Sequence, residues 1–183
     1  MSKTIEPSDI IQFWFKEIDS ALWWKKDLNF DALIIQRFSR VHQQACRGEL
    51  YTWRSTAEGR LAEIIVLDQF SRNMFRDKKE AFAQDSLALI LAQEVVSIGL
   101  DKALTQIQRS VLYLPFMHSE SFIIHQVAEQ LYEKLGITSS CEFELKHKLI
   151  IEKFGRYPHR NKILSRTSTE DEIEFLTQPN SSF

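Results

Sequence analysis

Apolar residues recur every three or four positions along most of the chain, which is the spacing of one face of an α-helix. The clearest run contains Phe30, Ile34, Phe38, Val41 and Ala45. The same spacing elsewhere predicts a first helix from about residue 8 and a last one from residue 168. Between them it predicts helices over about residues 29–47, 55–68, 79–98, 105–114, 119–135 and 140–154.

The residues that flank these runs match the usual signals for helix ends. Ser55 is followed three residues later by Glu58, the spacing of a capping box, and Thr105 and Gln108 repeat it. The helix that begins at residue 105 should end before Pro115, because the residue ahead of a proline resists the α conformation. Glycine, which readily takes the left-handed conformation, should end four of the helices. These are Gly48, Gly99, Gly136 and Gly155.

The segment Ile64–Leu67 is apolar on every side, so its helix should lie at the centre of the protein. The chain has only 5 Gly and 4 Pro, too few for the many tight turns of a β-sandwich. Short connections between helices favour antiparallel neighbours. We therefore expect an all-α fold of stacked antiparallel helical hairpins, forming one domain over residues 1–183.

The composition argues against several classes of partner and location. With 23 basic and 25 acidic residues the net charge is −2, which gives no general attraction to nucleic acid, so no such partner is expected. Cys46 and Cys141 lack the spacing of a redox or metal motif and lie in amphipathic stretches, as buried free thiols do. No apolar run approaches the ~20 residues that cross a membrane, and no signal region precedes the first helix. We expect a cytoplasmic protein that does not contact a membrane.

Three polar segments flanked by aromatic residues interrupt the helical pattern. They are Asp68–Asn73, Pro115–Glu120 and Phe154–Asn161. Each lies at the end of an expected helix, and stacked hairpins bring their ends to a common rim. We therefore expect the three segments to meet in space.

These segments also make the chain resemble a known family. Together with Trp23-Trp24-Lys25-Lys26-Asp27, the run Gly-Arg-Tyr-Pro-His-Arg-Asn at 155–161 and Ser-Ser-Phe at 181–183, they are similar to the bacterial family catalogued as domain of unknown function 924. The resemblance covers almost the whole chain. It implies a helical fold similar to tetratricopeptide repeat proteins, and it implies no activity.

The third segment is rich in positive charge. From Gly155 to Arg166 the chain carries Arg156, Arg160, Lys162 and Arg166 without an acidic residue. Because guanidinium groups match carboxylate and phosphate oxygens in pairs, we expect a groove that binds an anionic small molecule or an acidic peptide. The expected lining residues are Arg72, Asn73, His118, Glu120, Arg156, His159, Arg160 and Asn161.

Two other roles fit the same residues. The arginines could pair with acids such as Asp68 and only tie helix ends together, in a structural or interaction module. Alternatively, His118 with Glu120, or His159, could provide the acid/base group of a small hydrolase. Against the second role, no serine lies in a Gly-x-Ser-x-Gly elbow.

Metal and cofactor motifs are absent from the sequence. His118 and His125 are seven residues apart, about 10 Å along one helix, too far to share one ion. There is no HExxH or CxxC motif and no glycine-rich phosphate loop. We expect neither a metal nor a nucleotide cofactor.

The adjacent residues Trp23 and Trp24 cannot both face one core from a helix. We expect the pair to pack against Trp14 and Phe15 of the first helix. The alternative is that one ring is exposed and forms an aromatic platform for a ligand.

Overall fold

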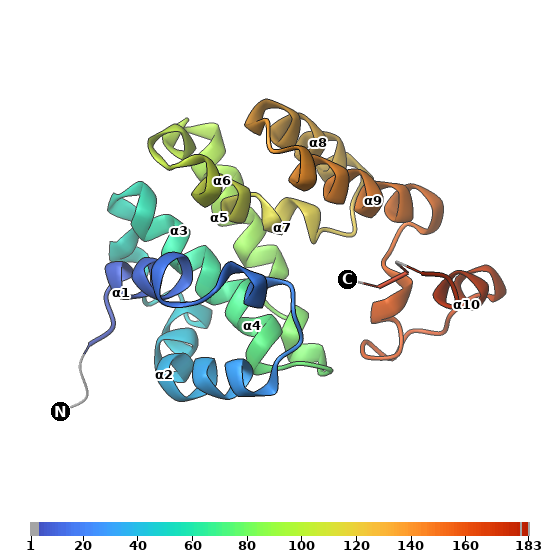
Figure 1. The fold of residues 1–183 in the computed structure, drawn as a ribbon, viewed down its shortest axis with the longest axis horizontal. Helices are drawn as coiled ribbons and strands as arrows, with labels where there is room; N and C mark the ends of the chain where they lie inside the picture. Colours follow the sequence, from blue (N-terminus) through green and yellow to red (C-terminus); the bar gives the residue numbers. More distant parts are fainter. Residues whose placement is uncertain (1–3, 180, 183) are drawn as a thin grey trace.

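The protein is a set of helices joined by short turns (Figure 1). The computed structural model describes residues 4–179, 181 and 182. The α-helices are α1 (Pro7–Gln12), α2 (Leu28–Cys46), α3 (Ala57–Leu67), α4 (Gln69–Met74), α5 (Asp85–Ser97), α6 (Gln106–Leu112), α7 (Leu114–Met117), α8 (Phe122–Leu135), α9 (Thr138–Phe154) and α10 (Glu170–Leu176). Short 3₁₀ segments are η2 (Ser20–Trp23), η3 (Tyr51–Ser55), η4 (Lys79–Phe82), η5 (Leu100–Ala103) and η6 (Pro158–Arg160), and η1 (Phe13–Glu17) is a π-helical turn. No strand occurs among the described residues, and the expected all-α fold is confirmed.

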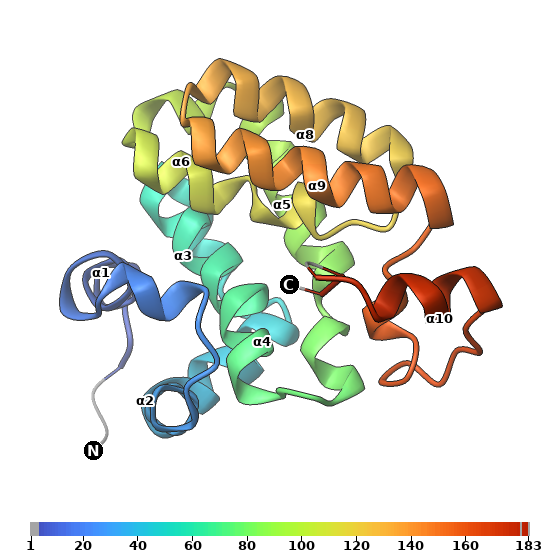
Figure 2. The same cartoon turned by 45° about the vertical axis from the view of Figure 1, so that its right-hand side comes forward.

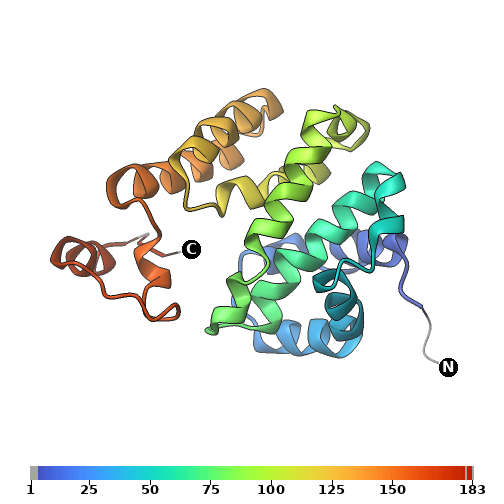
Figure 3. The ribbon, with the colours of Figure 1, turned by 180° about the vertical axis from the view of Figure 1, so that it is seen from behind.

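Helix α3 lies in the middle, in contact with α1, α2, α5 and α6. Seen from behind, α3 and α5 run side by side across the molecule (Figure 3). Helices α8 and α9 form a long antiparallel hairpin that covers α6 and α7, and α10 lies beyond its far end (Figure 2). The hairpin pairing is therefore present in this part of the chain. A complete superhelix similar to tetratricopeptide repeats stays a prediction.

The glycines end helices as expected. Gly136 follows α8 with φ 76° and Gly155 follows α9 with φ 69°, both in the left-handed region that glycine adopts without strain. Each backbone N–H bonds back into its helix, Gly136 to the Tyr132 carbonyl at 3.2 Å and Gly155 to the Ile151 carbonyl at 2.8 Å. The chain can therefore reverse direction within two or three residues.

Several helix starts lie one or more residues from the expected position. Asp27, and not Asn29, caps α2: its Oδ1 accepts from the backbone N–H groups of Asn29 and Phe30 at 2.9 and 3.0 Å. Thr56 caps α3 in place of Ser55, accepting from the Gly59 N–H at 3.0 Å. In each case two residues close together in the chain can cap, and the one that does so has extended backbone dihedrals.

Two predicted helices are interrupted. The expected helix over 79–98 is divided into η4 and α5, because the Ala81 carbonyl accepts a hydrogen bond from the Arg72 guanidinium instead of continuing a helical ladder. The helix expected over 105–114 does end before Pro115, at Leu112, but a further helix, α7, begins at Leu114 with Pro115 in its first turn. A proline is tolerated there because the first N–H groups of a helix have no partner within it.

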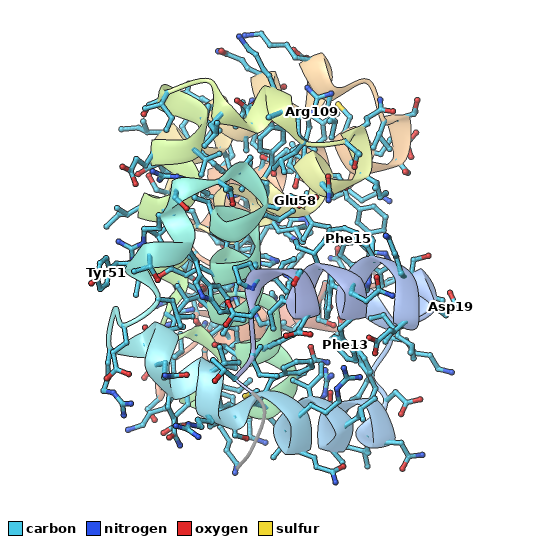
Figure 4. All side chains as sticks on the ribbon, turned by 90° about the vertical axis from the view of Figure 1, so that its left-hand side faces the viewer. Phe13, Phe15, Asp19, Tyr51, Glu58 and Arg109 are labelled. Carbon is cyan, nitrogen blue, oxygen red and sulfur yellow. The ribbon has the colours of Figure 1, made fainter. Side chains whose placement is uncertain are left out.

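On one side of α3 the core consists of packed aromatic rings, whereas most of the buried side chains of α3 itself are aliphatic. The ring centroid of Phe38 lies 4.8 Å from that of Phe13 and 4.9 Å from that of Phe70. In Figure 4, η1 crosses between α2 and α3, with Phe13 on its α2 side and Phe15 on the opposite side. The expected packing holds for Trp23, whose ring stacks on Trp14 with centroids 5.8 Å apart. It is wrong for Trp24, which is 68% exposed, as the alternative for one of the two rings had it.

We expect Ile64→Ala and Leu67→Ala each to lower the free energy of unfolding by ~2–5 kcal/mol, because these side chains are 1% and 0% exposed in the centre of the core. Urea unfolding measures the loss. Ile90→Ala in α5 is the matched control, because Ile90 is 60% exposed and should cost much less. Equal small losses at all three positions would contradict the central placement of α3.

Candidate functional site

The three polar segments meet, as the sequence predicts. Nδ1 of His118, after α7, lies 2.7 Å from Oδ1 of Asp68, at the junction of α3 and α4. The backbone N–H of Tyr157, just before η6, donates to Oε1 of Glu120 at 2.7 Å. Residues 50 and 37 positions apart in the chain are thus joined by direct hydrogen bonds at the ends of their helices.

Asp68 is 1% exposed, and its carboxylate is surrounded by polar partners. Besides His118, Gln69 donates its Nε2–H to Oδ2 at 2.5 Å, and Arg72 Nη2 lies 3.8 Å from Oδ1. Burial alone would raise the pKa of Asp68, but His118 and Arg72 lower it from 3.8 to about 2. Asp68 is therefore ionised near neutral pH, and it holds the Nδ1 edge of the imidazole ring.

The other nitrogen of this imidazole is available. His118 Nε2 forms no hydrogen bond with any described residue, and it is not sealed from solvent. The expected partner of His118 was Glu120, and the structure pairs the two residues differently. Glu120 accepts two hydrogen bonds from Arg166 at 2.6 and 2.9 Å, which occupy its carboxylate.

A second buried cluster joins two arginines through one acid. Arg72 donates to both oxygens of Asp85, at 2.8 and 2.9 Å, and Arg160 donates to Oδ2 at 3.3 Å. The Phe82 ring lies beside both guanidinium groups, 4.7 Å from Cζ of Arg72 and 4.6 Å from Cζ of Arg160. The ring of Tyr157 lies 4.5 Å from Cζ of Arg160. Aromatic faces thus hold the two like charges close together.

Arg160 has fewer hydrogen bonds than its burial requires. Its side chain is 7% exposed, yet the 3.3 Å contact with Asp85 is its only hydrogen bond to a described side chain or carbonyl. Nε is buried without a partner among the described residues, and Nη2 also lacks one but is not sealed from solvent. Burial and the neighbouring Arg72 lower the pKa of Arg160 below its ordinary value. The folded protein therefore holds a cation that is only partly compensated.

His118 and Arg160 border the same pocket. It has a volume of ≈320 Å³ and lies between η4 and α5 on one side and the α7–α8 connection and η6 on the other. Its lining includes Lys79, Phe82, Asp85, His118, Ser119, Glu120 and Arg160. Of the expected groove residues, His118, Glu120 and Arg160 line this pocket, and Arg72 supports it from behind through Asp85.

The other expected residues lie elsewhere. Asn73 donates to Asp31 at 2.9 Å, in a cluster that Arg76 completes. Arg156 donates to both oxygens of Glu172 at 2.7 and 2.8 Å, and Asn161 donates to Glu172 at 3.2 Å. These contacts hold the start of α10 and form no part of the pocket lining.

His159 is close to the pocket without lining it. Its ring centroid lies 5.5 Å from that of Tyr157. Burial, with a smaller contribution from Arg160, lowers the pKa of His159 to about 4. Its imidazole is therefore neutral near pH 7 and is a poor proton donor there.

A fully buried pair positions the α7–α8 connection. His125 and Glu144 are both 0% exposed, and Nδ1 of His125 lies 2.6 Å from Oε1 of Glu144. Nε2 of His125 lies 2.9 Å from the Ser119 carbonyl, and the Tyr157 hydroxyl donates to the Met117 carbonyl at 2.5 Å. The residues on both sides of His118 are thus fixed from α8, α9 and η6.

The fold and this site define an all-α protein in which partly buried ion pairs at helix ends border a polar pocket. The chain belongs to the family described as bacterial protein of unknown function (DUF924), whose model matches residues 10–180. A solved structure of a protein of unknown function from Agrobacterium tumefaciens is similar to it, with a TM-score of 0.88 and 39% identity over 93% of this chain and 96% of that one. A search of curated proteins finds no match.

Two further findings concern the described residues as a whole. None of their helices is both long enough and apolar enough to cross a bilayer. No group of three or more His, Cys, Asp or Glu side chains among them is arranged to hold a metal ion.

The two arginines should differ in their effect on stability. Arg72→Gln removes the closest cation of Asp85 and the second cation beside Asp68 and should cost ~3–5 kcal/mol of unfolding free energy. Arg160→Gln relieves repulsion and leaves Asp85 paired with Arg72, so it should cost only about 1 kcal/mol. Urea unfolding of both variants measures the difference, and a larger loss for Arg160→Gln would contradict this assignment.

Acid stability should depend on Asp68. Because its pKa is lowered in the folded protein to about 2, its ionised form stabilises the fold above pH ~4, and this contribution is lost as the pH falls toward 2. We expect Asp68→Asn to be less stable at neutral pH and to lose less stability between pH ~4 and ~2 than the unaltered protein. Urea midpoints measured across this range test it; parallel curves would show that Asp68 is not the group that titrates.

Proposed function

We propose that this protein binds an anionic small molecule in the pocket between α5, the α7–α8 connection and η6, and that Arg160 is the group that holds it. The observation that carries this proposal is a buried guanidinium with one long hydrogen bond and no partner for Nε among the described residues. Buried polar groups are nearly always hydrogen-bonded, and an exception needs an explanation. Nε itself is sealed from solvent, so an anionic ligand would supply its acceptor to Nη2 of the same guanidinium, which is unpartnered among the described residues and open to solvent.

The electrostatics support the same conclusion. Arg72 and Arg160 share a single carboxylate, that of Asp85, and their mutual repulsion contributes to the lowered pKa of Arg160. An anion beside Arg160 reduces this repulsion. Part of the binding energy of the anion therefore comes from compensating a repulsion between two guanidinium groups that is already present in the free protein.

The pocket favours a small molecule over an acidic peptide. A volume of ≈320 Å³ falls at the lower end of the range of ligand pockets, roughly 300–1,000 Å³. Arg160, His118 and Lys79 border this pocket, whereas Arg156 and Lys153 line a separate pocket beside α10. Arg156, which would lengthen the positive surface, is engaged with Glu172.

A second function, acid/base catalysis, is favoured by the hydrogen bond between Asp68 and His118. A buried carboxylate at Nδ1 holds the ring in one orientation, with Nε2 available to the pocket. In this reading Asp68 takes the orienting role that the sequence suggested for Glu120, and the anion at Arg160 is the substrate.

Thermal unfolding with a panel of anions tests the binding function. A ligand at 100 times its dissociation constant adds about 2.7 kcal/mol of stability. We expect phosphate, sulfate or a small carboxylic acid to raise the melting temperature of the unaltered protein and to have little effect on Arg160→Gln. Arg37→Gln is the control, because Arg37 pairs with Glu17 on the surface away from the pocket and should keep the full response.

Two outcomes of the melting-temperature comparison would contradict the proposed anion site. If no anion raises the melting temperature of the unaltered protein, it has no anion site of useful affinity. If Arg160→Gln responds as strongly as Arg37→Gln, the anion binds elsewhere. Either result removes the proposal.

A further inference from the structure

We propose that the ligand of this pocket is a tetrahedral dianion of the phosphoryl type and that it binds together with one proton, which His118 carries. This inference rests on the proposed anion site and adds the chemical class of the ligand. It also assigns a separate role to each of the two pocket cations. Arg160 is a permanent charge, and His118 is a charge that appears when the ligand arrives.

The charge balance of the cluster is the first reason. Arg72, Arg160 and Arg166 face three carboxylates at short range, those of Asp68, Asp85 and Glu120. With a neutral imidazole these six charges cancel, and the exposed ammonium of Lys79 adds one positive charge at the pocket, enough to match only one of the two charges of a dianion. A dianion that enters such a site needs further positive charge, because an uncompensated charge in a partly buried site is costly. A proton on His118 supplies it at the wall of the pocket.

The setting of His118 is the second reason. Its Nδ1 already faces an ionised, buried carboxylate at 2.7 Å, so an added proton creates an ion pair with Asp68. The ring then has N–H groups on both sides, one donating to Asp68 and the other, on Nε2, free to donate to the ligand. Protonation thus changes Nε2 from an acceptor, which repels an oxyanion, into a charged donor.

The direction of the donors is the third reason. The guanidinium of Arg160 comes from η6, the imidazole of His118 and the hydroxyl of Ser119 come from the α7–α8 connection, and the Lys79 ammonium comes from η4. A planar carboxylate has two oxygens, and a single guanidinium fork satisfies both. Donors arriving from three elements instead match the several oxygens of a phosphoryl or sulfuryl group.

The ionisable groups around His118 come from every neighbouring element. They are Asp68 at the α3–α4 junction, Arg72 on α4, Lys79 on η4, Asp85 on α5, Glu120 on its own connection, His125 on α8, Glu144 and His147 on α9, and His159 and Arg160 on η6. Burial lowers the pKa of His147 to about 3 and that of His159 to about 4. The binding measurements below run from pH ~5.5 to ~8.5, and both histidines are neutral throughout this range. His125 is sealed in its pair with Glu144.

Sulfate is the probe of choice, because it is a tetrahedral dianion that does not itself titrate in this pH range. Isothermal titration calorimetry in two buffers with different ionisation enthalpies measures the protons taken up on binding. At the upper end of the range we expect uptake to approach one proton, and sulfate affinity to fall by close to tenfold per pH unit. Acetate should bind at least about tenfold more weakly than sulfate.

His118→Asn should take up no proton and should bind sulfate weakly at every pH. Asp68→Asn should keep proton uptake but move the fall in affinity to lower pH, because the carboxylate that stabilises the imidazolium is gone. Arg37→Gln should behave like the unaltered protein. If His118→Asn fails to fold, the two-buffer measurement on the unaltered protein still decides whether a proton is taken up, and the ring signals of His118 in NMR spectra show where.

The outcomes separate this inference from the binding function. Sulfate binding that needs Arg160 but takes up no proton, or proton uptake that persists in His118→Asn, would overturn the inference and leave the anion site intact. Acetate binding as tightly as sulfate would overturn the phosphoryl assignment. Failure of every anion to bind would overturn the anion site and this inference together.

Discussion

A carboxylate removed from water has to be matched by positive charge and hydrogen bonds, and Asp68 places this requirement at the centre of the molecule. It lies where α3 passes into α4, at the end of the most buried helix. His118, Arg72 and Gln69 satisfy it. Because His118 comes from the α7–α8 connection, this one group fixes the distance between the first helices and the last ones.

The same requirement extends outward as a chain of shared charges. Arg72 contacts Asp68 and Asp85, and Asp85 also holds Arg160. On the other side of the pocket Arg166 holds Glu120, whose other contact is the backbone of Tyr157. Ion pairs and hydrogen bonds at the helix ends thus hold neighbouring helices together there, as apolar contacts do around α3. Their last members, Arg160 and His118, are the ones that remain incompletely bonded and reach the pocket.

The sequence predicts the helices better than it predicts the pairs. Periodicity and glycine stops locate most helices, because both depend on residues close together in the chain. The meeting of the three polar segments also follows, from their position at helix ends. Which acid joins which base does not follow: the sequence suggested Glu120 as the partner of His118, whereas in the structure Arg166 engages Glu120 and His118 contacts Asp68. Asp85, at the first position of α5, carries no signal beyond that of a favoured helix start.

The pocket is built from residues that are distant in the order of synthesis. The larger apolar core is made by residues between Ile10 and Leu135, whereas a smaller one around Ile150, Ile151 and Tyr157 supports η6. A chain emerging from the ribosome therefore has the material for its main core well before it has Arg160. Until η6 docks, Asp85 faces Arg72 alone, and the cavity lacks one wall. The lining of the pocket is therefore complete only after η6 has docked against α5 and the α7–α8 connection.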